Sequence, residues 1–210
     1  MKRIAVFVSG GGTNLAALIE AEKSGILKSG KICCVISSKE DAYALTRAKE
    51  NGIGTYVVRK KDFSSQDEQD MRLIAILESE QIDLIVLAGY MSILSERFTR
   101  TYQNRIINVH PALIPSFCGD GYYGLRVHQA ALDYGVRLTG ATVHFVNEIT
   151  DGGAIILQKA VEIKAGDTPE ILQRRVMEEA EWKLLPQACE LFCADRLIVS
   201  GRTVTIKEEK

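Results

Sequence analysis

The first hundred residues alternate short apolar runs with stretches of helical periodicity, and this alternation restricts the fold more than any other feature of the chain. The runs are apolar on both faces, which is typical of strands buried inside a parallel sheet. The helices between them return the chain by right-handed crossovers. The pattern predicts an α/β, Rossmann-like half with helices on both faces of the sheet. The predicted strands are Ile4–Val8, Ile32–Ile36, Gly54–Val58 and Leu84–Ala88, and the predicted helices are Leu15–Ala21, Asp41–Lys49 and Glu68–Glu80.

The pattern changes after Ala88. A further strand is followed by a loop rich in glycine and proline, then by a helix and by a strand pair whose hairpin would make the sheet mixed. Thr168 and Pro169 suit the start of a long C-terminal helix, which Pro186 is expected to kink or break. These elements are strand Arg105–Val109, loop Pro111–Gly124, helix Leu125–Tyr134, strands Thr139–Val146 and Ala154–Ile163, and a terminal hairpin of Leu197–Val199 and Val204–Ile206.

Composition and charge narrow the class of protein. The 26 Lys and Arg against 27 Asp and Glu leave a formal net charge of −1, without the basic excess of a nucleic-acid binder. No apolar run approaches the roughly 18 residues that span a bilayer, and the apolar stretch Ile4–Val8 is too short for the core of a signal peptide. The five cysteines and three histidines lack the spacing of a zinc site. We therefore expect one cytoplasmic domain over 1–210 without metal, nucleic acid or membrane, divided softly into halves 1–100 and 101–210.

A glycine-rich segment, Ser9–Asn14, lies between the first predicted strand and the first predicted helix. Glycines let the backbone approach a ligand, and the free N–H groups at a helix start attract an anion. The third glycine of a dinucleotide fingerprint is absent, because residue 15 is leucine. The segment predicts a cradle for one phosphate, made by Gly12, Thr13 and Asn14. The alternative is a tight turn that Thr13 or Asn14 caps.

Asn108 and His110 come at the end of a buried strand, the edge where open α/β sheets bind ligands. Two positions apart on a strand, they project to the same side. An amide donor beside an imidazole suits a reaction that builds an oxyanion and moves a proton. The alternative is a pair of strand-end residues bonded to backbone.

Asp151-Gly152-Gly153 is the third candidate, although Asp-Gly is far more often a turn than a catalyst. If this turn folds back to the Asn108–His110 edge, Asp151 could fix the tautomer of His110 and favour its charged form near neutral pH. The other two histidines are expected to serve structure. His128 is placed on the solvated face of its helix, and His144 is interpreted as a bonded strand residue.

Five segments together carry a resemblance to a known family. They read IAVFVSGGGTNL at 4–15, LAGYM at 87–91, INVHPALIP at 107–115, GATVHFV at 140–146 and DGG at 151–153. In register from about residue 3 to residue 190, they resemble the phosphoribosylglycinamide formyltransferases of the formyltransferase superfamily. The resemblance implies a mixed sheet of seven strands and an enzyme of de novo purine biosynthesis. It would transfer a formyl group from 10-formyltetrahydrofolate to the amine of glycinamide ribonucleotide, as a monomer or homodimer and without a metal.

The resemblance also assigns roles by position. Asn108, His110 and Asp151 would be catalytic, and Glu181 would bind the ribonucleotide together with the phosphate cradle of Gly12, Thr13 and Asn14. The folate would contact Met91, Ser92, Ile93, Leu94, Asn108, Asn147, Glu148, Ile149, Thr150 and Asp151.

Three positions depart from the family pattern. Gln66 stands where a basic residue often meets the folate glutamate tail, so Lys60 or Lys61 could take its place. Cys118 and Trp182 replace the usual proline and histidine. Two other functions stay open on the sequence alone, a formyltetrahydrofolate hydrolase and a non-catalytic folate- or nucleotide-binding module.

Overall fold

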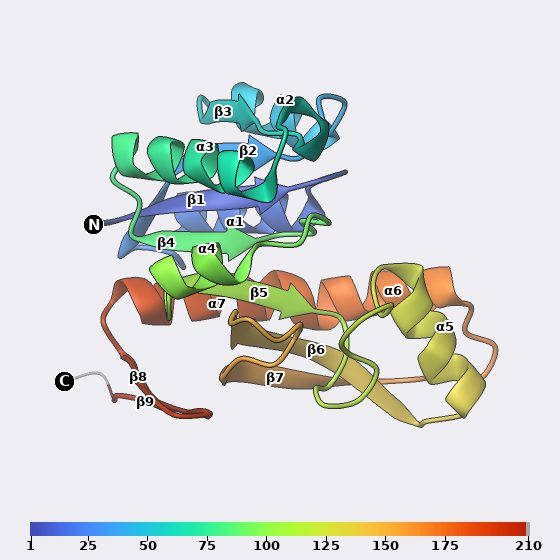
Figure 1. The fold of residues 1–210 in the computed structure, drawn as a ribbon. Coiled ribbons are helices and arrows are strands. Elements are labelled where there is room, and N and C mark those ends of the chain that lie inside the picture. The colour runs from blue at the N-terminus through green and yellow to red at the C-terminus, as the bar shows by residue number, and fades with distance from the viewer. Residues whose placement is uncertain (209–210) are drawn as a thin grey trace.

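The structure, a computed structural model, describes residues 1–208. In this range seven strands form one sheet in the order β3-β2-β1-β4-β5-β6-β7, and β8 pairs with β9 separately. Within the large sheet only β6 runs against its neighbours, which confirms the predicted mostly parallel α/β fold (Figure 1). The strands are β1 (Lys2–Val8), β2 (Gly30–Ser37), β3 (Gly54–Val57), β4 (Leu84–Leu87), β5 (Ile106–His110), β6 (Leu138–Phe145), β7 (Ile155–Glu162), β8 (Leu197–Ser200) and β9 (Thr203–Ile206).

Helices cover both faces of the sheet, as the apolar runs predict (Figure 1). Ile4 and Val6 of β1 pack into a core with residues of α1, α2, α6 and α7. Ala5 and Phe7 point to the opposite face and pack with residues of α3 and α4. The helices are α1 (Thr13–Ser24), α2 (Tyr43–Glu50), α3 (Gln66–Ser79), α4 (Glu96–Thr101), α5 (Leu125–Tyr134), α6 (Pro169–Val176) and α7 (Trp182–Cys193), with a 3₁₀ turn η1 (Lys60–Asp62) and a π-helical turn η2 (Met177–Glu181).

Two local features differ from the sequence expectations. Helix α4 was not predicted, because its six residues are too short for a periodic pattern. Its side-chain cap is Ser95, and its apolar anchor is the buried Phe98. Of the kink or break expected at Pro186, the break does not occur, since α7 continues through that residue. The irregularity lies just before α7, in η2, where a widened turn relieves the crowding that a proline ring imposes on the preceding turn.

The parallel strands bring several loops to one edge of the sheet. The carboxyl ends of β1, β4 and β5 lead into Ser9–Gly12, Gly89–Leu94 and Pro111–Gly124. Open α/β sheets bind ligands at this edge. Among the described residues, no helix has both the length and the apolar character needed to cross a bilayer.

Candidate active site

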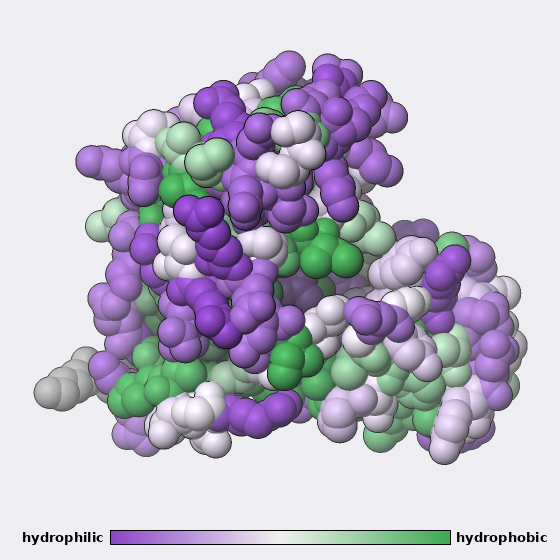
Figure 2. Space-filling view, in the orientation of Figure 1, coloured by the Kyte–Doolittle hydropathy of each residue, from purple (hydrophilic) through white to green (hydrophobic). Residues whose placement is uncertain are grey.

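The Asn108 and His110 side chains project from the carboxyl end of β5 into one cavity of about 560 Å³. Strand β5 lies inside the sheet between β4 and β6, so hydrogen bonds on both sides hold its backbone. His110 is buried and Asn108 is half-buried. Figure 2 shows the hollow near the middle of the molecule.

Asp151 reaches the same place from the loop between β6 and β7. One carboxylate oxygen lies 2.9 Å from the backbone nitrogen of Gly119, which donates to it, and 3.5 Å from His110 Nδ1. The turn therefore folds back to the edge that carries His110. A role for Asp151 in the chemistry depended on this arrangement. Asp-Gly-Gly serves here both as a turn and as the means of presenting a carboxylate.

Both glycines of this turn are required by close approach. A Cβ on Gly153 would lie 1.7 Å from the carbonyl oxygen of Phe145, and a Cβ on Gly152 would lie 2.6 Å from the Ile149 side chain. Asp151 itself has a φ of 55°, a left-handed conformation that Asp tolerates better than most residues. The backbone thus holds the carboxylate in one position over the sheet.

His110 has an acceptor at each ring nitrogen. Its Nε2 lies 2.8 Å from the carbonyl oxygen of Phe117, to which it donates, and its Nδ1 faces Asp151. Burial nevertheless lowers the pKa of His110, although Asp151 and the Phe117 carbonyl oppose the shift. Asp151 therefore favours the charged form of His110, as expected, but desolvation outweighs this attraction in the structure.

Asp151 stays ionised at neutral pH. Burial alone would raise its pKa, but the protonated forms of His144 and His110 and the Gly119 N–H stabilise the carboxylate, and the net effect lowers the pKa below the ordinary value. The site therefore pairs a neutral imidazole with a fixed negative charge. A proton that reaches His110 would be stabilised by that charge.

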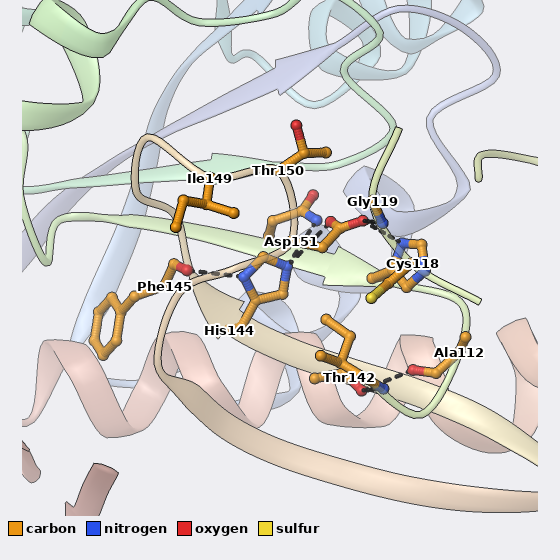
Figure 3. Close-up of polar contacts among 12 residues, drawn as sticks. Ala112, Cys118, Gly119, Thr142, His144, Phe145, Ile149, Thr150 and Asp151 are labelled. Carbon is orange, nitrogen blue, oxygen red and sulfur yellow. Dashed lines mark hydrogen bonds and ion pairs between the residues drawn. The ribbon is translucent and has the colours of Figure 1, made fainter. Parts of the chain in front are cut away.

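His144 belongs to this cluster, which the interpretation of the sequence missed. It lies opposite Asn108 in the antiparallel pairing of β5 and β6. Its Nε2 is 3.2 Å from Asn108 Nδ2 and 3.5 Å from an oxygen of Asp151 (Figure 3). The signal was the predicted hairpin, because pairing its first strand with the Asn108 strand places His144 beside that amide.

His128 was expected on the solvated face of its helix, and this is wrong. Its side chain in α5 is 0% exposed, and neither ring nitrogen has a partner among the described residues. Burial lowers the pKa of His128 to about 4, with a smaller contribution from His110. His128 is therefore neutral at neutral pH.

The cavity gathers residues that the resemblance assigns to folate. Two loops meet across it, one after β4 and one after β6. Met91, Ile93 and Ile149 keep large apolar side chains exposed at this place, which suits a flat, largely apolar ring system. The assigned residues that line it are Met91, Ser92, Ile93, Leu94, Asn108, Asn147, Glu148, Ile149, Thr150 and Asp151, together with His110.

The glycine-rich segment forms the start of α1. Gly12 has a φ of 70°, and a Cβ there would lie 2.6 Å from that of Ala44, so only glycine fits. No side chain caps the helix, so the alternative interpretation, a tight turn that Thr13 or Asn14 caps, is not observed. The first N–H groups of α1 are therefore available to an anion.

Glu181, the last residue of η2, approaches the same segment. Its carboxylate accepts a hydrogen bond of 2.8 Å from Asn14 Nδ2. Burial raises the pKa of Glu181 to about 6, while the bond from Asn14 lowers it in part. The other amide atom of Asn14, Oδ1, is buried without a partner among residues 1–208. The four residues assigned to the ribonucleotide are thus neighbours.

Known proteins resemble this chain closely in sequence and in fold. The model of the formyl transferase family matches residues 2–189. The chain belongs to the formyl transferase family. It is 45% identical to the phosphoribosylglycinamide formyltransferase of Haemophilus influenzae, over 94% of this chain and 90% of that protein. The solved glycinamide ribonucleotide transformylase 1 of Symbiobacterium toebii is 39% identical, with a TM-score of 0.92 over 99% of this chain and 95% of that chain.

A solved formyltetrahydrofolate deformylase from Pseudomonas syringae pv. tomato is also similar to this formyl transferase. It is 28% identical with a TM-score of 0.87, and the match covers 99% of this chain and 66% of that chain. The comparisons confirm the resemblance found in the sequence and the expectation of an enzyme that transfers a one-carbon group.

The three departures from the family pattern have different surroundings in this formyl transferase. Gln66 donates to Asp70 over 3.0 Å, so its amide is already engaged. Cys118 donates to the carbonyl oxygen of Pro115, and burial and Asp151 raise the pKa of its thiol. Trp182 Nε1 is buried without a partner among the described residues.

Lysines gather instead in a second cavity of about 570 Å³, beside the first. The two cavities share Met91 and Ser92. Lys39, Lys60 and Lys61 line the second one, and the guanidinium of Arg59 there is paired with Glu40 and Asp62. Residues 1–208 contain no group of three or more potential metal ligands.

Proposed function

We propose that the protein transfers the formyl group of 10-formyltetrahydrofolate to the amine of glycinamide ribonucleotide. The observation that carries this proposal is the convergence of Asn108, His110 and Asp151 at one end of a cavity. Formyl transfer to an amine needs a donor for an oxyanion and a route for protons, and these side chains supply both.

The reaction begins when the amine attacks the formyl carbon and a C–N bond forms. The carbonyl oxygen becomes an oxyanion, which the Asn108 amide stabilises by a donated hydrogen bond and the protonated ring of His110 by its positive charge. A preorganised donor of this kind is worth about 3–4 kcal/mol. The developing negative charge favours the protonated form of His110, which offsets the desolvation that keeps this residue neutral beforehand.

Collapse of the intermediate breaks the bond from the formyl carbon to the folate nitrogen. The attacking amine loses one proton and the departing nitrogen gains one, so the reaction takes up no net proton. Asp151 stabilises the imidazolium while the proton is in transit, because its carboxylate lies 3.5 Å from His110 Nδ1. No step requires a metal.

The ribonucleotide would bind through its phosphate at the start of α1. Gly12, Thr13 and Asn14 provide backbone N–H groups there, and Glu181 lies beside them. The donor would place its pterin between Met91–Leu94 and Asn147–Asp151, which line the cavity that holds the catalytic group. The two substrates would then meet at Asn108.

The hydrolase remains a second candidate because the deformylase structure shares the fold. A decisive experiment supplies 10-formyltetrahydrofolate with and without glycinamide ribonucleotide and follows tetrahydrofolate release. We expect release to accelerate by orders of magnitude with the nucleotide, because a bound amine reaches a far higher effective concentration than an unpositioned water. Equal rates would indicate the hydrolase, and no release in either condition would indicate a binding module.

A further inference from the structure

His144 is a buried histidine at the catalytic group, with a distinct contact at each ring nitrogen. Its Nδ1 lies 2.8 Å from the backbone carbonyl oxygen of Phe145. A carbonyl oxygen can only accept, so Nδ1 carries the hydrogen of this bond. In a neutral ring, Nε2 is then the atom with the free lone pair.

That lone pair faces the Asn108 side chain. Asn108 Nδ2 lies 3.2 Å from His144 Nε2, within hydrogen-bond range, and in this arrangement the amide donates. The reversed amide would place its oxygen against the lone pair, with no hydrogen between two acceptors. The Phe145 carbonyl, whose contact with His144 is drawn in Figure 3, therefore fixes the tautomer of His144. The tautomer in turn fixes which end of the Asn108 amide faces the ring.

We propose that His144 is a positioning residue for formyl transfer, whose Nδ1-protonated ring holds the Asn108 amide with its nitrogen in the site. One N–H of the Asn108 amide donates to His144, and the second is available to donate to the oxyanion. Without this partner the amide can reverse and present its oxygen, an acceptor, to a developing negative charge. This inference rests on the proposed function.

A route through Asp151 is the competing explanation. His144 Nε2 lies 3.5 Å from an Asp151 oxygen, which is longer than its contact with Asn108. Asp151 is also held independently by the Gly119 N–H at 2.9 Å and by the tight Gly152-Gly153 turn. Asn108 Nδ2 has only the contact with His144 among the side-chain hydrogen bonds of residues 1–208. The geometry thus favours Asn108 as the group that depends on His144.

The test compares two substitutions of His144 in steady-state and single-turnover formyl transfer. His144→Leu removes the acceptor, and His144→Gln keeps an amide oxygen close to the position of Nε2. We expect kcat to fall roughly tenfold in the Leu variant, less than the 10²–10³ for complete loss of an oxyanion donor. KM for the ribonucleotide should stay unchanged, and the Gln variant should recover most of the rate.

Double-mutant cycles identify the route. In an Asn108→Ala background, His144→Leu should cost less than twofold, because no amide remains to be positioned. In an Asp151→Asn background it should keep its full effect. An undiminished loss beside Asn108→Ala, or a loss that vanishes beside Asp151→Asn, overturns the proposal, and so does wild-type turnover in the Leu variant.

A spectroscopic readout makes the result independent of activity. The ¹⁵N shifts of the neutral His144 ring in the wild-type protein should show a protonated Nδ1 and an unprotonated Nε2. A ring protonated on Nε2 overturns the proposal even if every variant folds poorly. Absence of formyl transfer by the wild type would instead reject the proposed function and leave this tautomer assignment standing.

Discussion

The two regions proposed to bind the substrates of this enzyme differ in whether backbone or side-chain atoms form them. The cradle at the start of α1 consists mainly of backbone atoms. Glycine is required at position 12 by its left-handed conformation and by the lack of space for a Cβ. The catalytic cluster consists of side chains from three separated segments, with Asn108 and His110 on β5, His144 on β6 and Asp151 in the following loop. The first region presents backbone N–H groups that can bind an anion. The second is a network of buried side chains in which hydrogen bonds and charges set the position of each proton.

This difference predicts separable effects of mutation. A change in the backbone-built region should alter the affinity for one substrate and leave the chemistry intact. A change in the side-chain cluster should alter the chemical step, because each group there sets the protonation or orientation of another. The predictions below test that separation.

The largest effect is expected for Asp151→Asn. The neutral amide cannot stabilise a charged His110, so formyl transfer should slow by at least ~100-fold, about 2.7 kcal/mol of transition-state stabilisation. Ribonucleotide affinity should barely change, which calorimetric titration can measure beside single-turnover rates. Near-normal turnover would remove Asp151 from the mechanism, and equal losses of rate and affinity would erase the contrast between the regions.

The second prediction concerns His128, whose burial should make the free energy of unfolding depend on pH. Its pKa of about 4 in the folded protein lies below the ordinary histidine value near 6.5, so the unfolded chain binds more protons between these pH values. The contribution of His128 to the free energy of unfolding should therefore fall by about 2 kcal/mol as pH drops from 7 to 4.5. Denaturant titrations should show this loss as the difference in pH dependence between the wild type and a variant without His128.

The matched variant is His128→Leu, which cannot titrate and removes two unpartnered ring nitrogens. It should lose correspondingly less stability over the same range. Asp151 does not confuse the result, because its lowered pKa places its contribution at more acidic pH. Glu181, with a pKa raised to about 6, has the opposite sign but contributes equally to both proteins. Identical pH slopes would show that His128 is not the acid-sensitive group.

The same contrast explains how far the sequence could be interpreted. Gly12 and the Asn108–His110 pair could be recognised because each signal lies within a few residues of one strand end. Asp151 could be stated only conditionally, since nothing local determines where a turn folds. His144 and His128 were placed wrongly or undervalued because their surroundings come from strand pairing and helix packing. Local patterns reveal backbone sites and leave side-chain clusters incomplete.

Secondary structure followed the same rule. The repeated strands and helices of the first half have strong periodicity, and the structure contains them with small shifts at their ends. Helix α4 depends on one buried residue, Phe98, and on the Ser95 cap. Two such features are too few to distinguish a short helix from a loop in the sequence. Pro186 misled because the rule for helix interiors ignores the wide turn that precedes it.

Gly12→Ala tests the backbone-built region. The added Cβ would collide with Ala44, and the left-handed conformation at Gly12 penalises any side chain. We expect ribonucleotide affinity to fall about tenfold, since the first N–H groups of α1 shift. Gly11→Ala is the control, because a Cβ there meets nothing within 4 Å. Folate affinity should stay constant in both, whereas a parallel loss of both ligands would indicate a damaged fold.

The smallest effect is expected for the glutamate tail of the folate donor. We expect this tail to bind in the second cavity, beside the catalytic cavity. Its cations are side chains, but they are exposed, so each should contribute little. With Gln66 bonded to Asp70, the glutamate tail would meet Lys60 and Lys61. Lys60→Ala combined with Lys61→Ala should raise KM for a polyglutamylated donor a few-fold at low salt, leave KM for the monoglutamate nearly unchanged, and leave kcat intact. The difference should fade as salt screens the charges.

The control is Lys159→Ala. Lys159 is exposed on β7 and lies outside both cavities, so this change should alter neither KM. A loss of kcat in the double variant would mean that the exposed lysines communicate with the buried cluster, and the two regions could then no longer be treated as separate.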